Sequence, residues 1–116
     1  MIDVNRITLC GNLTKDPVFK QVGTDSLVCE FRIAVNRTWF TKTGEKQKKT
    51  CYVDIEAWNK IAAKCEGVLT KGSPVFVDGS LEYDSWSDKD DENVTNSRHY
   101  VKAEIINFFG DPRKES

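Results

Sequence analysis

Alternation of apolar and polar side chains, with a period of two residues, runs through most of this sequence and sets what the chain can fold into. The pattern occupies residues 4–13, 27–36 and 50–57, and it returns at 75–81 and 98–109. A strand that buries one face gives this period, because successive side chains point to opposite faces. The sequence therefore predicts five strands, each with one face in a core.

One segment departs from this period. After Asn59 the apolar residues fall at helical spacing, at Ile61, Ala62, Cys65, Val68 and Leu69, and Gly72 follows as the predicted helix end. Three strands, a helix and two strands predict an all-β fold, a five-stranded Greek-key barrel of the OB-fold kind. The helix lies between strands three and four, where it can close one end of the barrel. A small β-sandwich is the alternative arrangement.

The length of 116 residues is enough for one core and too little for two. We expect a single domain over residues 1–110 and a short C-terminal extension, without an acidic tail, over 111–116. No apolar run approaches the roughly 18 residues that a membrane-spanning helix needs. The first residues resemble neither a signal peptide nor a transit peptide, so we expect a cytoplasmic or already processed chain.

The cysteines show no metal-binding pattern. They stand at Cys10, Cys29, Cys51 and Cys65, separated by 19, 22 and 14 positions, so no Cys-x-x-Cys pair exists for zinc or thiol exchange. His99 is the single histidine, and the acidic run 88–92 lacks the glycine and the distal glutamate of a calcium loop. We therefore expect reduced cysteines packed as small hydrophobes, with neither a metal nor a cofactor.

Charge is distributed unevenly along the chain. Residues 1–50 hold nine Lys and Arg against five Asp and Glu, whereas residues 51–116 hold eight against thirteen. The two parts therefore carry net charges of +4 and −5, although the whole chain carries only −1. Residues 41–49, polar and rich in lysine, are predicted to form a hairpin loop. Such an asymmetry allows a basic stripe on an almost neutral protein.

Aromatic residues accompany these cations. Trp39 and Phe40 open the basic loop, Tyr52 and Trp58 belong to the non-core face of the third strand, and Trp86 begins the loop after the fourth. Exposed rings can stack on nucleic-acid bases, and nearby cations can follow the phosphate backbone. The alternative is structural: rings of this kind also cap barrel ends or fill subunit contacts, and lysines keep loops solvated. Rings interleaved with cations favour a single strand over a duplex, which hides its base faces.

Several segments, in this order and spacing, carry a family resemblance: Val4–Leu13, Asp16-Pro17, Phe31–Asn36 and Lys71–Gly79. With them the chain resembles the bacterial and mitochondrial single-stranded DNA-binding proteins. The resemblance implies a homotetramer, a dimer of dimers, that binds single-stranded DNA without sequence preference in replication, recombination and repair. It implies no enzymatic activity. It also implies replication and repair enzymes as partners, and a nucleoid-associated cytoplasmic location in bacteria or an organellar matrix.

Family positions add roles to individual residues. By resemblance, stacking rings correspond to Trp39, Tyr52, Trp58 and Trp86, and backbone-contacting cations to Arg6, Lys60 and Lys71. Together with the basic residues around the rings, the predicted DNA-binding set is Trp39, Tyr52, Trp58, Trp86, Arg6, Arg32, Lys42, Lys48, Lys49, Lys60 and Lys71.

Two departures from the family pattern qualify these roles. Asp54 stands where many bacterial relatives have a basic residue, and residues 82–85 read Glu-Tyr-Asp-Ser. This predicts weaker binding or a different DNA path there. Residues 107–116 also lack the glycine-rich linker and acidic tip by which bacterial relatives recruit enzymes. One alternative is a tail-less, primosome-type dimeric adaptor acting through protein contacts. Another, a metal-dependent nuclease using residues 88–92, lacks a histidine–carboxylate constellation.

Overall fold

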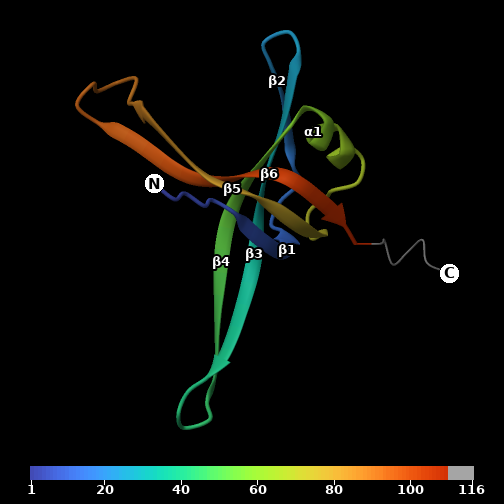
Figure 1. Cartoon of the computed structure of the whole chain (residues 1–116), viewed down its shortest axis with the longest axis vertical. Coiled ribbons are helices and arrows are strands. Elements are labelled where there is room, and N and C mark those ends of the chain that lie inside the picture. Colours follow the sequence, from blue (N-terminus) through green and yellow to red (C-terminus); the bar gives the residue numbers. More distant parts are fainter. Residues whose placement is uncertain (110–116) are drawn as a thin grey trace, which may run out of the picture.

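The computed structural model describes residues 1–109, and within them it contains six strands and one helix. Figure 1 shows their arrangement. In chain order they are β1 (Ile7–Leu13), β2 (Val18–Val22), β3 (Ser26–Phe40), β4 (Lys46–Trp58), α1 (Asn59–Cys65), β5 (Pro74–Ser87) and β6 (Thr95–Phe108). The predicted extension over residues 111–116 lies outside the described residues. No helix in the described part is long and apolar enough to cross a membrane.

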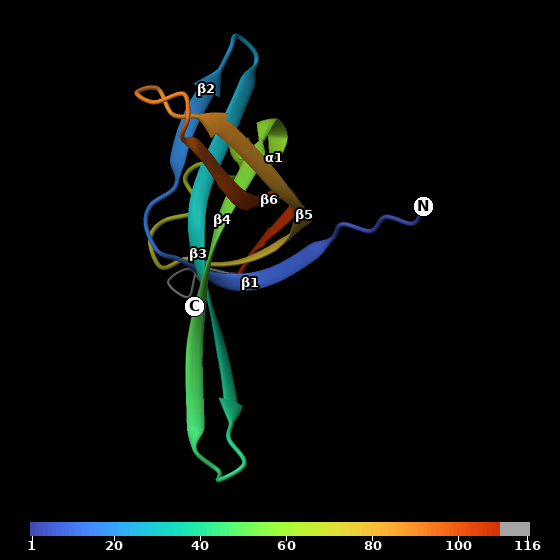
Figure 2. The same ribbon diagram turned by 90° about the vertical axis from the view of Figure 1, so that its left-hand side faces the viewer.

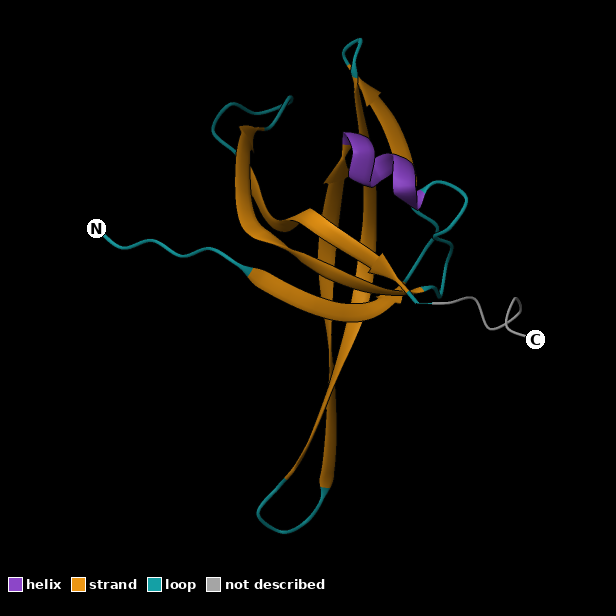
Figure 3. Cartoon of the chain, turned by 45° about the vertical axis from the view of Figure 1, so that its right-hand side comes forward, coloured by secondary structure: helices purple, strands orange, loops and turns teal. Residues whose placement is uncertain are grey.

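The strands close into a barrel. Hydrogen-bonded neighbours follow the order β1-β5-β6-β4-β3-β2, and β1 also pairs with β3. Five strands therefore form a closed ring, and β2 extends it as a hairpin partner of β3 (Figure 3). All pairs are antiparallel except β4 with β6. The predicted all-β class, with a closed five-stranded barrel and one short helix, is confirmed.

The core follows the alternation seen in the sequence. Fully buried side chains come from four strands and the helix, among them Ile33, Ile55, Val75, Val77 and Val101. Burying an aliphatic side chain of this size contributes about 1.5 to 3 kcal/mol. The helix adds Ala62 and Cys65, both completely buried, and it packs on β3, β4 and β6. These contacts fix one end of β4 against the barrel.

The helix is shorter than predicted. It begins at Asn59, which has a φ of 52° and accepts a hydrogen bond from the backbone N–H of Leu27 through its side-chain oxygen. It ends at Cys65 rather than near Gly72. Leu69 is still buried, because a turn after the helix returns it to the core, whereas Val68 is half exposed. The apolar spacing therefore indicated burial correctly at Leu69 without indicating helix.

One strand was not predicted. β2 covers residues 18–22, for which the sequence pattern predicted no element, and its outward residues Val18, Lys20 and Val22 are exposed. Only Phe19 packs partly against the core. The strand is held instead by main-chain pairing with β3 from Val18 to Val22. A strand with so little buried surface has no alternation for a sequence pattern to detect.

Strand ends also differ from the prediction. The pairing of β3 with β4 continues until Phe40 lies opposite Lys46, so residues 46–49 belong to a strand and the predicted loop 41–49 shrinks to 41–45. Likewise β5 continues through Trp86, which was expected in a loop, and β6 begins at Thr95 instead of Arg98. The first strand begins at Ile7 instead of Val4. Main-chain pairing extends these ladders without needing apolar side chains.

The cysteines divide into two kinds. Cys29 and Cys65 are completely buried in the core, as expected, whereas Cys10 and Cys51 are exposed. Cys51 has the phase of core residues, but it lies near the end of the barrel, opposite Val35, where the core runs out. A hydrogen bond with the Cys65 thiol and burial raise the pKa of the Cys29 thiol. The expectation of packed cysteines is therefore wrong for two of the four.

Candidate nucleic-acid interface

Two connected surfaces hold most of the predicted site residues. The first is the basic arm, which we define as residues 36–50, where the β3–β4 hairpin projects away from the barrel (Figure 2). The second is the outer face, formed by those side chains of β3, β4, β5 and β6 that point away from the core. β4 belongs to both, so a ligand can pass from one surface to the other along a single strand.

Rings and cations lie together on the arm. Trp39 and Phe40 are 38% and 68% exposed, and the guanidinium carbon of Arg37 lies 5.2 Å from the centre of the Trp39 ring. Trp39 has the phase of the core residues of β3, but it lies beyond the barrel, opposite Gln47, where no core covers it. The arm also carries Lys42, Lys46, Lys48 and Lys49, all exposed. Among the described residues, none of these four lysines forms an ion pair.

Three of the predicted rings share the outer face. Tyr52 and Trp58 alternate with the buried residues of β4, and Tyr52 is 62% exposed. Trp58 is half-buried, and its indole N–H donates a hydrogen bond to Glu56. Trp86 is 48% exposed. It alternates in step with Asp84 of β5, which lies opposite the outward Arg98 of β6, so the Trp86 ring is on the same outer face. The expected placement of Tyr52 and Trp58 on the non-core face is correct.

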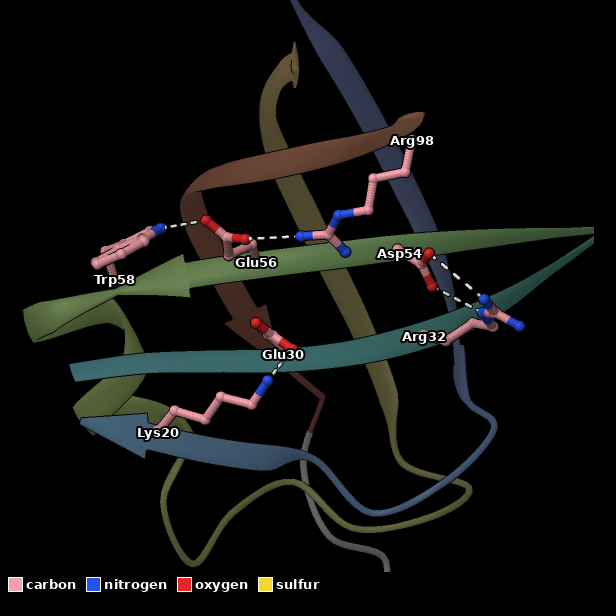
Figure 4. A network of polar contacts seen from close by, with 7 residues as sticks. All are labelled: Lys20, Glu30, Arg32, Asp54, Glu56, Trp58 and Arg98. Carbon is pink, nitrogen blue, oxygen red and sulfur yellow. Dashed lines mark hydrogen bonds and ion pairs between the residues drawn. The ribbon is translucent and has the colours of Figure 1, made fainter. Parts of the chain in front are cut away.

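Ion pairs cross the outer face from strand to strand (Figure 4). Lys20 contacts Glu30 at 3.3 Å, Arg32 contacts Asp54 at 2.7 Å, and Arg98 contacts Glu56 at 3.1 Å. These pairs link β2 to β3, β3 to β4, and β4 to β6. The network joins a ring as well, since Glu56 accepts from both Trp58 and Arg98.

Arg6 has a similar partner elsewhere. Its guanidinium contacts Asp78 of β5 at 2.7 Å. For both Arg6 and Arg32, the hydrogen bond to the carboxylate raises the pKa of the guanidinium. Arg6 and Arg32, both predicted to bind DNA, are therefore each paired with a carboxylate of the protein itself.

Tyr100 marks the most enclosed part of the outer face. Burial, followed by the charge of Glu56, raises the pKa of its phenol to about 12. Arg98 lies over the ring, with its guanidinium carbon 4.5 Å from the ring centre. A cleft of about 300 Å³ adjoins this region and is lined in part by Arg98, Arg32 and Asp54. The cleft thus mixes both signs of charge.

The last two predicted cations lie around the helix. Lys60 is exposed in the first turn of α1, two residues after Trp58. Lys71 is exposed in the turn before β5, and its backbone N–H donates to the Asp16 carboxylate at 2.7 Å. Neither lysine forms an ion pair within residues 1–109. Lys60 therefore continues from the Trp58 end of β4, whereas Lys71 lies against the turn between β1 and β2.

Some residues at these surfaces were not singled out from the sequence. Arg37 and Arg98 each lie against a ring, and Glu56 connects Trp58 to Arg98. The alternation held a signal for the two arginines, because each stands two positions before its aromatic partner on the same strand. The sequence held no such signal for Glu56, because its contact with Arg98 depends on β4 and β6 being neighbours in the sheet.

The sequence comparisons find related proteins over nearly the whole chain. A Single-stranded DNA-binding protein 2 of Chlorobaculum tepidum is 38% identical over 115 residues, which cover 98% of this chain and 76% of that protein. A Single-stranded DNA-binding protein 1 of Synechocystis is 30% identical over 112 residues, covering 97% and 88%.

Solved structures show the same fold. A Plasmodium falciparum SSB in complex with single-stranded DNA superimposes with a TM-score of 0.81 and 26% identity, covering 95% of this chain and 98% of that one. A deletion mutant of the single-stranded DNA-binding protein from Thermus aquaticus gives a TM-score of 0.81 at 23% identity, and the match covers 94% of this chain and 52% of that one. The profile of the Single-strand binding protein family matches residues 4–109. The members of this family are binding proteins rather than enzymes. The chain therefore belongs to the Single-strand binding protein family.

Proposed function

We propose that this protein binds single-stranded DNA without sequence preference, through base stacking and backbone charge. The observation that carries the proposal is the arm, where exposed Trp39 lies among lysines that have no carboxylate partner in the described chain. Tyr52 and Trp86 offer further exposed rings on the outer face. A stack on one base contributes about 1 to 3 kcal/mol, whatever the base. The names of the relatives, and the complex of the Plasmodium protein, support the same ligand.

In this proposal the cations of the site contact the phosphates of the DNA. Lys42, Lys48 and Lys49 on the arm hold phosphates, and Lys60 and Lys71 continue the contact around the helix. Arg6 and Arg32 also belong to the proposed site, although each faces a carboxylate. Because phosphate contacts release counterions, affinity should fall as salt rises.

We further infer the finer architecture and setting. The strand order around the barrel supports a Greek-key OB-fold whose helix closes one end. By family likeness we propose a homotetramer, a dimer of dimers, that acts in replication, recombination and repair with enzymes of those processes as partners. Its proposed location is the bacterial cytoplasm or an organellar matrix.

Tryptophan fluorescence tests this function directly. Titration with poly(dT) at several salt concentrations should quench the emission, because Trp39 and Trp86 come into contact with bases. A duplex of matched length should quench little, since its base faces are covered. Absence of quenching with either DNA would refute the proposal and point instead to the dimeric adaptor acting through protein contacts.

A further inference from the structure

Cations on the two surfaces of the proposed site differ in what they already contact. The arm lysines form no ion pair within residues 1–109, whereas Arg32 and Arg98 on the outer face each contact a carboxylate. Figure 4 shows Arg32 and Arg98 with their carboxylate partners Asp54 and Glu56. A phosphate therefore meets unpaired lysines on the arm, whereas Arg32 and Arg98 on the barrel are each already neutralised by a carboxylate.

The pair between Arg32 and Asp54 is the closest of those on the outer face. The two residues lie directly opposite each other on β3 and β4. Nε of Arg32 lies 2.7 Å from Oδ1 of Asp54, and Nη2 lies 3.4 Å from Oδ2. The carboxylate thus occupies the fork of donors that a phosphate would use. Both side chains remain accessible, at 57% for Arg32 and 33% for Asp54, so DNA could reach them.

More carboxylates surround this pair. Arg98 contacts Glu56 on β4, and it lies opposite Asp84 on β5. Glu30, two residues before Arg32 on β3, contacts Lys20. A phosphate that replaced Asp54 would leave that carboxylate without a partner and close to a like charge. Exchange of Asp54 for phosphate is therefore opposed by electrostatics at the pair itself. One cation without an ion pair in the described chain, the exposed Lys15, lines the same cleft as Arg32 and Asp54.

We propose that Asp54 restricts the DNA-binding strength of the outer face by keeping Arg32 in an internal ion pair. Single-stranded DNA then contacts this face mainly through rings, while its phosphates are held by the arm. The inference rests on the proposed function, and it assigns to Asp54 the role of a residue that sets affinity and salt dependence without touching the bases.

Replacing Asp54 with Asn tests the assignment, because it removes the negative charge and keeps the size of the side chain. Arg32 becomes available, and one added phosphate contact on a single strand steepens the salt dependence by about 0.7 in log–log slope. The ratio of variant to wild-type affinity for oligo(dT) should therefore grow about fivefold when salt is lowered tenfold. The matched control is Asp25→Asn in the turn between β2 and β3, which changes net charge equally at a residue without an ion pair in the described chain.

A second variant shows whether the gain passes through Arg32. Adding Arg32→Gln to Asp54→Asn should abolish the extra slope. Persistence of the gain in the double variant, or an equal gain with Asp25→Asn, would overturn the proposal. If circular dichroism shows that Asp54→Asn does not fold, Asp54→Ala serves in its place. Failure of the wild-type protein to bind oligo(dT) would instead refute the proposed function, so the two failures are distinguishable.

Discussion

At the scale of single residues, exposure separates rings that differ little in sequence context. Trp39 lies beyond the barrel, is 38% exposed and is not among the residues packed against the hydrophobic core, and the guanidinium carbon of Arg37 lies 5.2 Å from its ring centre. Trp58 is half-buried and bonded to Glu56, so its removal also disturbs the outer face. The same substitution at the two positions therefore tests different properties.

Trp39→Ala should weaken binding of oligo(dT) at least tenfold at fixed salt, because one lost stack costs about 1.4 kcal/mol or more. Its free energy of unfolding should stay within about 0.5 kcal/mol of wild type, as for other exposed substitutions. Anisotropy titration and urea unfolding measure the two quantities. Trp58→Ala is the comparison, and it should lower both. Unchanged affinity in Trp39→Ala would remove this ring from the site.

Sequence alone predicted the rings better than their partners. Alternation along β4 correctly set Tyr52 and Trp58 outside the core, because that phase depends only on neighbouring residues. The ion pair of Arg6 with Asp78, 72 positions apart, could not be read in this way. Such partners are decided by which strands become neighbours. The masking of Arg32 by Asp54 was likewise out of reach, although Asp54 stood out as a departure from the family.

At the scale of elements, the arm differs from the barrel because it presents charged side chains rather than a packed core. Its strands are paired along their main chains up to Phe40 and Lys46, so lysines on β4 keep fixed spacing. Lys46 and Lys48 therefore share one face of the ladder and Lys49 lies on the other, in contrast to the loop predicted from the sequence. The strand was missed because its polar residues show no alternation that a pattern can use.

Lys48→Ala combined with Lys49→Ala should flatten the salt dependence of oligo(dT) binding, by about 1.4 in log–log slope if both hold phosphates. Affinities measured at four or more salt concentrations give the slope. Lys64→Ala combined with Lys89→Ala removes the same charge from the helix and from the loop before β6. An equal flattening in this control pair would mean that only net charge matters.

Gly79 is a packing requirement of β5. A Cβ at this position would lie 2.0 Å from the carbonyl oxygen of Lys102 on β6, next to the register shift between the two strands. Gly79→Ala should therefore lower the free energy of unfolding by about 1 to 3 kcal/mol or more, as overpacking does. Urea unfolding measures the loss. Ser85→Ala, at an exposed position of the same strand, should change stability by less than about 0.5 kcal/mol.

At the scale of the whole molecule, β1 offers an edge for assembly. It pairs with β5 from Ile7 to Asn12, but with β3 only at Asn12 and Leu13. Most of its second edge is therefore unpaired within the described chain, and open edges favour pairing with another copy. Light scattering should give four times the chain mass of 13.2 kDa. A mass of one or two chains would exclude the proposed tetramer.

The same ladders show a second place, besides the junction of β1 with β3, where few residue pairs close the barrel. Two long hairpins, β3 with β4 and β5 with β6, meet through only two parallel pairs, at Ile55 with Val101 and Glu56 with Lys102. The amide protons along this narrow seam should exchange with solvent sooner than those in the middle of either hairpin, through openings that leave both hairpins intact. The contact of Arg98 with Glu56 spans the seam. A ligand that competes with Glu56 for Arg98 would thus remove an ion pair between β4 and β6 and make opening of this seam easier.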